Sequence, residues 1–307
     1  MLDRIRSQRF TAFEVIVVDD GSSAATRATY ADAWKNLDGR FRLIELGCPD
    51  SPGLGPSLAR NTGIDAAAGS IVTFCDDDDF WTSDTHLETM AEVFDADPEI
   101  ELYIANQSAV ACDGRVERRD WLPALVERVR SRRRSHAHGY RLALEDLLQG
   151  GGFAQLNILA VSKATAQAIG GFWTRTSYEE DRDFFWRAVD AARAIFFNPD
   201  VVAQHNIPDP ARQNNLSRSF TQTERWMISA LVSQHIALQV RSGSIRTMCE
   251  SYEGDILRRL SQHLSSEGRH ALGLQYARRA LAARMSLKWA LYTVTLAGRQ
   301  WLRREAA

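Results

Sequence analysis

The sequence has little cysteine, and what it has is scattered. Its 307 residues include four cysteines, Cys48, Cys75, Cys112 and Cys249, with no C-x-x-C pair and no finger-like spacing to histidine. This pattern excludes a disulfide framework and a structural zinc site. Widely separated single thiols are typical of a protein kept in a reducing compartment, so we expect a cytoplasmic location.

Long apolar runs and an excess of one charge are also absent. The N-terminal stretch MLDRIRSQRF is not followed by an apolar segment of signal-peptide length. The most apolar late segment, 287–302, is interrupted by Lys288 and Arg299 and is shorter than the ~20 residues that span a bilayer. Because 37 Lys and Arg face 39 Asp and Glu, the net charge is only −2, and we expect no nucleic-acid partner.

What is present is an ordinary globular composition, with 45% hydrophobic and 25% charged residues. Short β-branched runs at 13–18, 41–46 and 71–75 alternate with helical patterns at 26–37 and 57–69. This alternation predicts βαβ units and an α/β fold with a mostly parallel sheet flanked by helices. In such sheets, ligands bind beyond the carboxyl ends of the strands.

The last third of the sequence has a helical period throughout, beginning near residue 222. Two prolines and a polar run precede it, so we expect a boundary near 210–221. The sequence therefore predicts an α/β domain over 1–210 and a helical C-terminal region over 211–307.

Four consecutive aspartates, Asp76 to Asp79, follow the predicted strand 71–75. Like charges packed so closely need a cation or strong hydrogen-bond donors, and oxygen ligands of this kind suit Mg²⁺ or Mn²⁺. A calcium EF-hand loop is excluded, because Trp81 stands where the loop needs glycine and Leu87 where it needs glutamate. A solvated acidic turn or a helix N-cap is the alternative interpretation.

Four further residues are candidates for the functional site. Asp20, in VVDDGS, is placed to accept hydrogen bonds from a base or ribose, or else belongs to an ordinary strand-to-helix turn. Arg60 is a candidate to pair with a phosphate or to brace the carboxylates, with a plain surface arginine as the alternative. Asp181 is the candidate general base in YEEDRDFFWRA, where helix capping would also explain the acids. His205 is a candidate metal ligand or a structural histidine.

The sequence contains three motifs, VVDDGS (17–22), ARNTGIDAAAGSIVTFCDDDDFW (59–81) and GGF followed by YEEDRDFFWRA (170–188). Their order and spacing resemble those of the family 2 glycosyltransferases of the GT-A fold. The resemblance covers roughly residues 5–206. It implies an inverting, metal-assisted transfer of a sugar from a nucleotide-diphosphate donor to a hydroxyl of a saccharide, lipid-linked carrier or protein, with polysaccharide biosynthesis as the setting.

The same resemblance assigns roles to individual residues. It implies that Asp20, Arg60, Asp76 and Asp77 bind the nucleotide-sugar, and that Asp78, with His205, holds a divalent cation, Mg²⁺ or Mn²⁺. It implies that Asp181 deprotonates the acceptor hydroxyl.

One departure from the family pattern concerns the sheet. Members of the family open with a strand that here has no counterpart before the helix beginning at Met1, so we expect the strands 14–18 and 71–75 to lose a ladder partner. A catalytically inactive GT-A-like binding or scaffolding protein is therefore the alternative function. A nicotinamide-dependent oxidoreductase is disfavoured, because GLGPSL (53–58) breaks the dinucleotide glycine pattern.

Two further segments, one cationic and one amphipathic, are candidates for contact with a ligand or a membrane. The Arg-rich segment contains Arg128, Arg130, Arg132, Arg133, Arg134, His136 and His138. We expect a solvated loop there, with contact to an acceptor phosphate or an anionic membrane as the alternative. The last helices could rest on a membrane through Trp289, Tyr292, Leu296 and Trp301, but packing into a core is the favoured interpretation.

Overall fold

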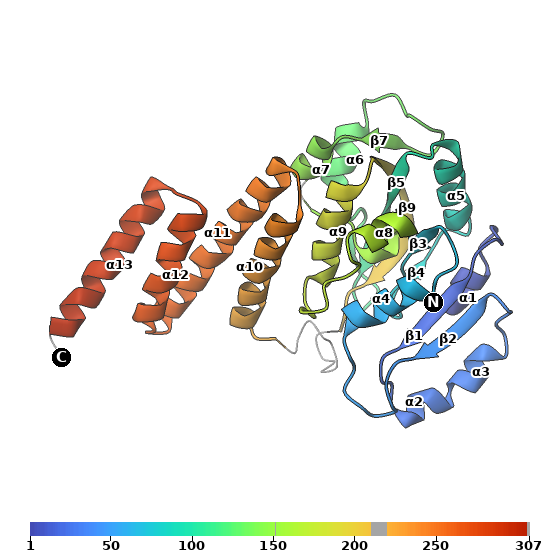
Figure 1. The fold of residues 1–307 in the computed structure, drawn as a ribbon, viewed down its shortest axis with the longest axis horizontal. Coiled ribbons are helices and arrows are strands. Elements are labelled where there is room, and N and C mark those ends of the chain that lie inside the picture. The colour runs from blue at the N-terminus through green and yellow to red at the C-terminus, as the bar shows by residue number, and fades with distance from the viewer. Residues whose placement is uncertain (151, 210–219, 306–307) are drawn as a thin grey trace. The chain divides into compact units, whose positions relative to one another are not determined.

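The computed structural model describes residues 1–150, 152–209 and 220–305, with the side chains of 303–305 left aside. The chain forms two compact units, Met1–Arg212 and Gln213–Ala307 (Figure 1). Most of the segment in which the sequence places a boundary, 210–221, lies outside the described residues.

The strands of the first unit form two sheets. A parallel pair joins β1 (Val15–Asp19) to β2 (Phe41–Glu45). A seven-stranded sheet has the order β3-β8-β5-β9-β4, with β6 added to β5 and β7 added to β9. Its strands are β3 (Ile71–Thr73), β4 (Phe80–Trp81), β5 (Ile100–Val110), β6 (Val116–Arg118), β7 (Tyr140–Leu142), β8 (Leu159–Ser162) and β9 (Ala194–Asn206).

The sheet is mixed, and the expectation of a mostly parallel sheet is wrong on this point. Among the described residues, only the ladders β1/β2 and β5/β9 are parallel, whereas β3/β8, β5/β8, β4/β9, β5/β6 and β7/β9 are antiparallel. The reason is that the strict strand-helix alternation ends near β5. β6 follows β5 through a short turn, and the short strands β7 and β8 pair antiparallel with strands that are distant in sequence, β9 for β7 and both β3 and β5 for β8.

The two sheets share no ladder in the part of the chain that the structure describes. There β1 is hydrogen-bonded only to β2, and β3 only to β8. This agrees with the expectation that the strands at 14–18 and 71–75 each lose a neighbour.

Helices surround the sheets and lie close to the expected positions (Figure 1). The pattern at 26–37 gives two short helices in place of one, which meet at Thr29. The helices of this unit are α1 (Leu2–Arg6), α2 (Ala24–Ala28), α3 (Tyr30–Trp34), α4 (Pro56–Ala66), α5 (His86–Ala96), α6 (Pro123–Val129), α7 (Leu144–Gln149), α8 (Lys163–Ala168) and α9 (Glu180–Ala191), with the 3-10 turn η1 (Leu156–Ile158).

The core of the first unit lies where α9 and η1 cover the long strands. Tyr103 on β5, Phe197 on β9 and Phe184 on α9 are fully buried. Large buried aromatic side chains contribute most to such a core, and here Phe184 packs edge-on against Phe74, just after β3, with ring centroids 5.8 Å apart. The carboxyl ends of β3 and the acids that follow it are thereby held near the start of α9.

The second unit is a run of helices, α10 (Gln222–Gln239), α11 (Gly243–Ser266), α12 (His270–Ala283) and α13 (Leu287–Glu305). Its core includes Leu257, Ala277, Trp289 and Leu296, and the indole N–H of Trp289 donates to the carbonyl of Ala277 at 2.9 Å. Core packing is thus confirmed for Trp289 and Leu296 and is wrong for Trp301, which is 59% exposed. None of the described helices has the length and apolarity needed to cross a membrane.

Candidate active site

The four aspartates after β3 occupy four different environments. Asp77 and Asp78 are exposed, Asp76 is half-buried, and Asp79 is 1% exposed. A buried carboxylate is costly unless donors satisfy it, so Asp79 needs partners from elsewhere in the chain. The block is therefore a structured turn with three carboxylates near its surface.

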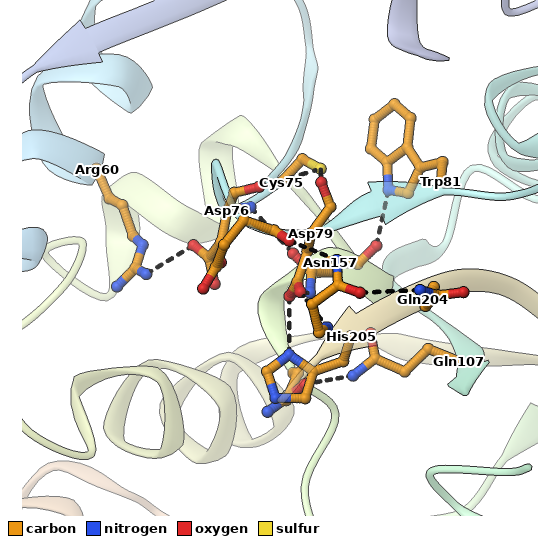
Figure 2. A network of polar contacts seen from close by, with 12 residues as sticks. Arg60, Cys75, Asp76, Asp79, Trp81, Gln107, Asn157, Gln204 and His205 are labelled. Atoms are coloured by element: carbon orange, nitrogen blue, oxygen red, sulfur yellow. Dashed lines mark hydrogen bonds and ion pairs between the residues drawn. The ribbon is translucent and has the colours of Figure 1, made fainter. Parts of the chain in front are cut away.

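Asp79 finds those partners on β9 and η1. Its Oδ1 accepts from the backbone N–H of Asn206 at 2.6 Å, and its Oδ2 lies 2.9 Å from Nδ1 of His205. The side-chain amide of Asn157 also donates to Oδ2 (Figure 2). Asp79, for which no individual role was predicted, thus joins the acidic turn to the end of β9.

Asn157 holds the turn from the other side. It is buried in η1, and its Oδ1 accepts from the backbone N–H of Asp76 at 3.0 Å. Its backbone carbonyl accepts from the indole N–H of Trp81 at 2.9 Å (Figure 2). This role of Asn157 was not predicted, although an asparagine inside the largely apolar run FAQLNILAV is a signal of a buried polar residue.

Arg60 joins the acidic turn to the start of α9. Its Nη2 lies 2.9 Å from Oδ1 of Asp76, and its Nη1 lies 2.8 Å from Oε1 of Glu180. Burial disfavours the guanidinium charge, but Asp76 and Glu180 outweigh it and raise the pKa of Arg60. Of the two functional roles that the sequence left open, the structure shows the bracing of carboxylates.

The turn that precedes α9 is clamped by α4. Gly170 and Gly171 have φ of 75° and 66°, a conformation that favours glycine. The side chain of Asn61 accepts from the N–H of Phe172 at 2.7 Å and donates to its carbonyl at 2.9 Å. Since Asn61 follows Arg60, one turn of α4 fixes both segments that carry the candidate acids.

Asp181 lies in the first turn of α9, half-buried, with its Oδ1 accepting from the N–H of Arg182 at 2.7 Å. Burial, together with the neighbouring charge of Glu180, raises the pKa of Asp181 to about 7. The residue before the helix, Glu179, has a φ of 60°, which is uncommon for a non-glycine residue and is found at functional turns. A carboxyl with a pKa near neutrality is suited to accept a proton.

Asp20 orders the loop that leads into α4. Its Oδ1 and Oδ2 accept from the backbone N–H groups of Leu54 and Gly55, at 2.8 and 2.7 Å. The chain passes so close that a Cβ on Gly53 would lie 2.8 Å from Oδ2 of Asp20. The nucleotide contact that the resemblance implies for Asp20 stays a prediction.

The two candidate metal ligands lie on the same polar network. Partial loss of hydration at the turn and the charges of Asp79, Asp77 and Asp76 raise the pKa of Asp78. Burial works against the charge on His205, but the bond to Asp79 and the acids around it raise the pKa of that imidazole. Within the described residues, no cluster of three or more His, Cys, Asp or Glu forms a ready cation cage.

This donor set fits Mg²⁺ or Mn²⁺ better than a preformed calcium or zinc site. Mg²⁺ is commonly held by one or two protein ligands, with water and substrate phosphates completing its shell. The crowded negative charge around Asp78 favours a cation, and a carboxylate on Nδ1 of His205 orients the ring so that Nε2 faces a ligand. The exposed carboxylates and this histidine are therefore compatible with the expected cofactor.

Part of the Arg-rich segment has a structural role. Arg128 and Arg132 form ion pairs with the buried Asp146 on α7, at 2.9 and 2.5 Å. Arg130 pairs with Glu127, while Arg133 is exposed. The expectation of a solvated loop is therefore wrong for Arg128, which lies on α6, whereas Arg132 and Arg133 are exposed in the loop as expected. The buried carboxylate of Asp146 needs the charge that Arg128 and Arg132 supply.

We predict that Asn157→Ala lowers the free energy of unfolding by about 1–3 kcal/mol, because the N–H of Asp76 and the carboxylate of Asp79 each lose a buried partner. Equilibrium urea denaturation measures the change. Asn36→Ala, at an exposed position, is the matched control and should change stability by less than about 0.5 kcal/mol. Equal effects of the two variants would contradict the assigned role.

The first unit is similar in sequence to known proteins. Residues 1–136 match the family model "Glycosyl transferase family 2". EpsH of Bacillus subtilis (strain 168), named as a glycosyltransferase, is 35% identical over 108 residues, 35% of this chain and 29% of its own length. The succinoglycan biosynthesis protein ExoO of Rhizobium meliloti (strain 1021) is 38% identical over 109 residues, 36% of this chain. The match again spans 29% of the length of ExoO.

Solved structures extend the likeness over more of the chain. Residues 1–349 of TarS from S. aureus, crystallised with UDP-GlcNAc, superpose with a TM-score of 0.62 and 16% identity. The superposition covers 92% of this chain and 76% of that one, and it shows a shared GT-A-like fold. Residues 1–136 are thus similar to the family 2 glycosyltransferases, and most of the chain shares the fold of the TarS fragment.

Proposed function

We propose that the protein transfers a sugar from a nucleotide-diphosphate donor to a hydroxyl acceptor. The observation that carries this proposal is the double ion pair of Arg60 with Asp76 and Glu180. This bridge holds a half-buried carboxyl of pKa about 7, that of Asp181, beside the acidic turn after β3. A proton acceptor and a cluster suited to a cation and a diphosphate thus converge on one place.

Asp181 acts as the general base in this proposal. With a pKa of about 7, its carboxylate is present at neutral pH and basic enough to accept the proton of a hydroxyl as that oxygen attacks the anomeric carbon. The bond from the N–H of Arg182 holds the carboxyl in place. A single displacement from the face opposite the leaving diphosphate inverts the configuration, as in single-step glycosidases.

The donor is bound on the side of β1 and β3. Asp20, Arg60, Asp76 and Asp77 contact the nucleotide-sugar in this proposal, and Asp78 with His205 would hold Mg²⁺ or Mn²⁺. When bound, such a cation stabilises the negative charge of a departing diphosphate. The crystallised TarS fragment binds UDP-GlcNAc, which makes this donor the first to test here.

The acceptor is a hydroxyl on a saccharide, a lipid-linked carrier or a protein. The name of ExoO places that relative in succinoglycan biosynthesis, and AmsB of Erwinia amylovora, 36% identical over 83 residues, is named for amylovoran biosynthesis. These names support a growing polysaccharide as the acceptor.

A second candidate function is that of a nucleotide-sugar-binding protein without transfer activity. The separate sheets favour it, because β1 and β3 share no ladder partner in the described part of the chain. Asp20 and the acidic turn are joined through α4 and the loop that enters it. Binding of a donor without hydrolysis or transfer would support this candidate over the first.

We predict that Asp181→Asn lowers the rate of transfer by about 10²–10⁴-fold, the usual contribution of a general base. Nucleotide-sugar binding, measured by isothermal titration calorimetry, should stay nearly unchanged. Asp65→Asn, at an exposed position on α4, is the matched control and should keep its activity. Unchanged turnover in Asp181→Asn would remove this residue from the role of base.

The pH profile gives an independent test of the base. Because only the deprotonated carboxyl accepts a proton, kcat/KM should rise with pH and level off above about 7, the pKa of Asp181. An aspartate with an ordinary pKa of about 3.9 would give a flat profile between about pH 5 and 8. Initial rates at fixed donor and metal concentration across this range measure the difference.

We also predict that Mn²⁺ strengthens nucleotide-sugar binding and that Asp78→Asn removes most of this effect. Titration of UDP-GlcNAc, followed by other nucleotide-sugars, with and without Mn²⁺ measures the coupling. Loss of one charged ligand should weaken the metal-dependent part by about tenfold or more. Asp65→Asn again serves as the control, and equal metal dependence in both variants would argue against Asp78 as the ligand.

A further inference from the structure

Helix α13 has two apolar faces, and only one of them is covered. Trp289 and Leu296 are each 6% exposed and pack into the core of the second unit. On the opposite side, an apolar stripe remains in the open, formed by Leu287, Leu291, Val294, Trp301 and Leu302, which are 79%, 62%, 71%, 59% and 60% exposed. Leu287, Leu291 and Val294 are spaced by four and three residues, and Trp301 and Leu302 follow on the same side two turns later, beyond the exposed Gly298.

The charges around this stripe are mostly basic. Residues 269–302 contain six basic residues and no acid, although the whole chain has a net charge of −2, and α13 ends at Glu305. The six are Arg269, Arg278, Arg279, Arg284, Lys288 and Arg299. Lys288 and Arg299 are exposed, and helical geometry places both on one flank, between the stripe and the buried face.

A groove of about 370 Å³ opens along the same flank. Its lining includes Ser265 and His270 from the α11–α12 corner and Tyr292, Thr295 and Arg299 from α13, and no carboxylate. A guanidinium beside hydroxyl groups is the chemistry that recognises a phosphate. The flank of the stripe is therefore suited to an anionic head group.

We propose that α13 binds the surface of an anionic lipid bilayer, with the exposed apolar stripe among the acyl chains and Lys288 and Arg299 at the level of the phosphates. A helix with one apolar face and a cationic flank lies in the plane of the membrane interface. Trp301 has the amphipathic ring that favours this depth. Of the residues considered for membrane contact from the sequence, Trp301 belongs to this stripe, whereas Trp289 and Leu296 are buried.

A second copy of the chain is a poorer occupant of the stripe. Two such helices, packed stripe against stripe, would bring Lys288 and Arg299 of both copies together, and like charges oppose such a contact. An anionic lipid surface supplies the missing negative charge, worth about 1 kcal/mol for each basic residue near it. The proposal concerns α13 alone and does not depend on the transfer activity.

The test is co-sedimentation of the full chain with vesicles. We expect binding to vesicles of equal parts phosphatidylcholine and phosphatidylglycerol and little binding to phosphatidylcholine alone. The double variant Leu291→Ser with Trp301→Ser should reduce binding by about tenfold or more, because two large apolar side chains lose their burial in lipid. Lys288→Glu with Arg299→Glu should reduce binding to the anionic vesicles and weaken its salt dependence.

Matched controls come from exposed positions elsewhere. Met227→Ser with Leu238→Ser removes two exposed apolar side chains from α10, and Arg119→Glu with Arg259→Glu reverses two exposed charges. Both should bind vesicles as the parent does, and circular dichroism should show that every variant is folded. Absence of vesicle binding, or equal loss in the controls, would overturn the proposal. A dimer in lipid-free sedimentation that Leu291→Ser abolishes would assign the stripe to a second copy and likewise overturn it.

Discussion

The acids at the end of β3 and at the start of α9 repel one another, and the site depends on how the chain compensates that repulsion. Asp79 is withdrawn into the protein and receives bonds from Asn157, His205 and Asn206. Arg60 neutralises part of the remaining charge by binding Asp76 and Glu180. Asp77 and Asp78 are left exposed, so the turn keeps negative charge for a ligand while its backbone is fixed.

Arg60 can brace the carboxylates and also contact a phosphate. A guanidinium carries five N–H donors, of which the bonds to Asp76 and Glu180 use one each. The remaining donors allow a contact with a phosphate without loss of the brace. Compensation by a fixed arginine, rather than by a mobile lysine, therefore suits a site that must keep its shape as an anionic ligand arrives and leaves.

The sequence predicted the parts of this site that are local and missed those that are not. Strand ends, the acidic turn and Asp181 follow from short-range patterns, and the structure places them close to where they were expected. Asn157 and Asp79 owe their importance to a bond between residues 78 positions apart, which no local pattern encodes. The antiparallel pairing of β8 with β3 and β5 was not predicted for the same reason, because both partners are distant from β8 in sequence.

Helix α4 and its flanking loops connect the two sheets, which share no strand in the described part of the chain. At its N-terminal end, Asp20 binds the loop that enters the helix, and at its C-terminal end the side chain of Glu14 accepts from the N–H of Gly69 at 3.2 Å. Between these anchors, Arg60 and Asn61 reach the acidic turn and the turn before α9. A shift of β1 against β3 would therefore move Arg60 as well, so the geometry around Asp181 depends on how firmly α4 is held at both ends.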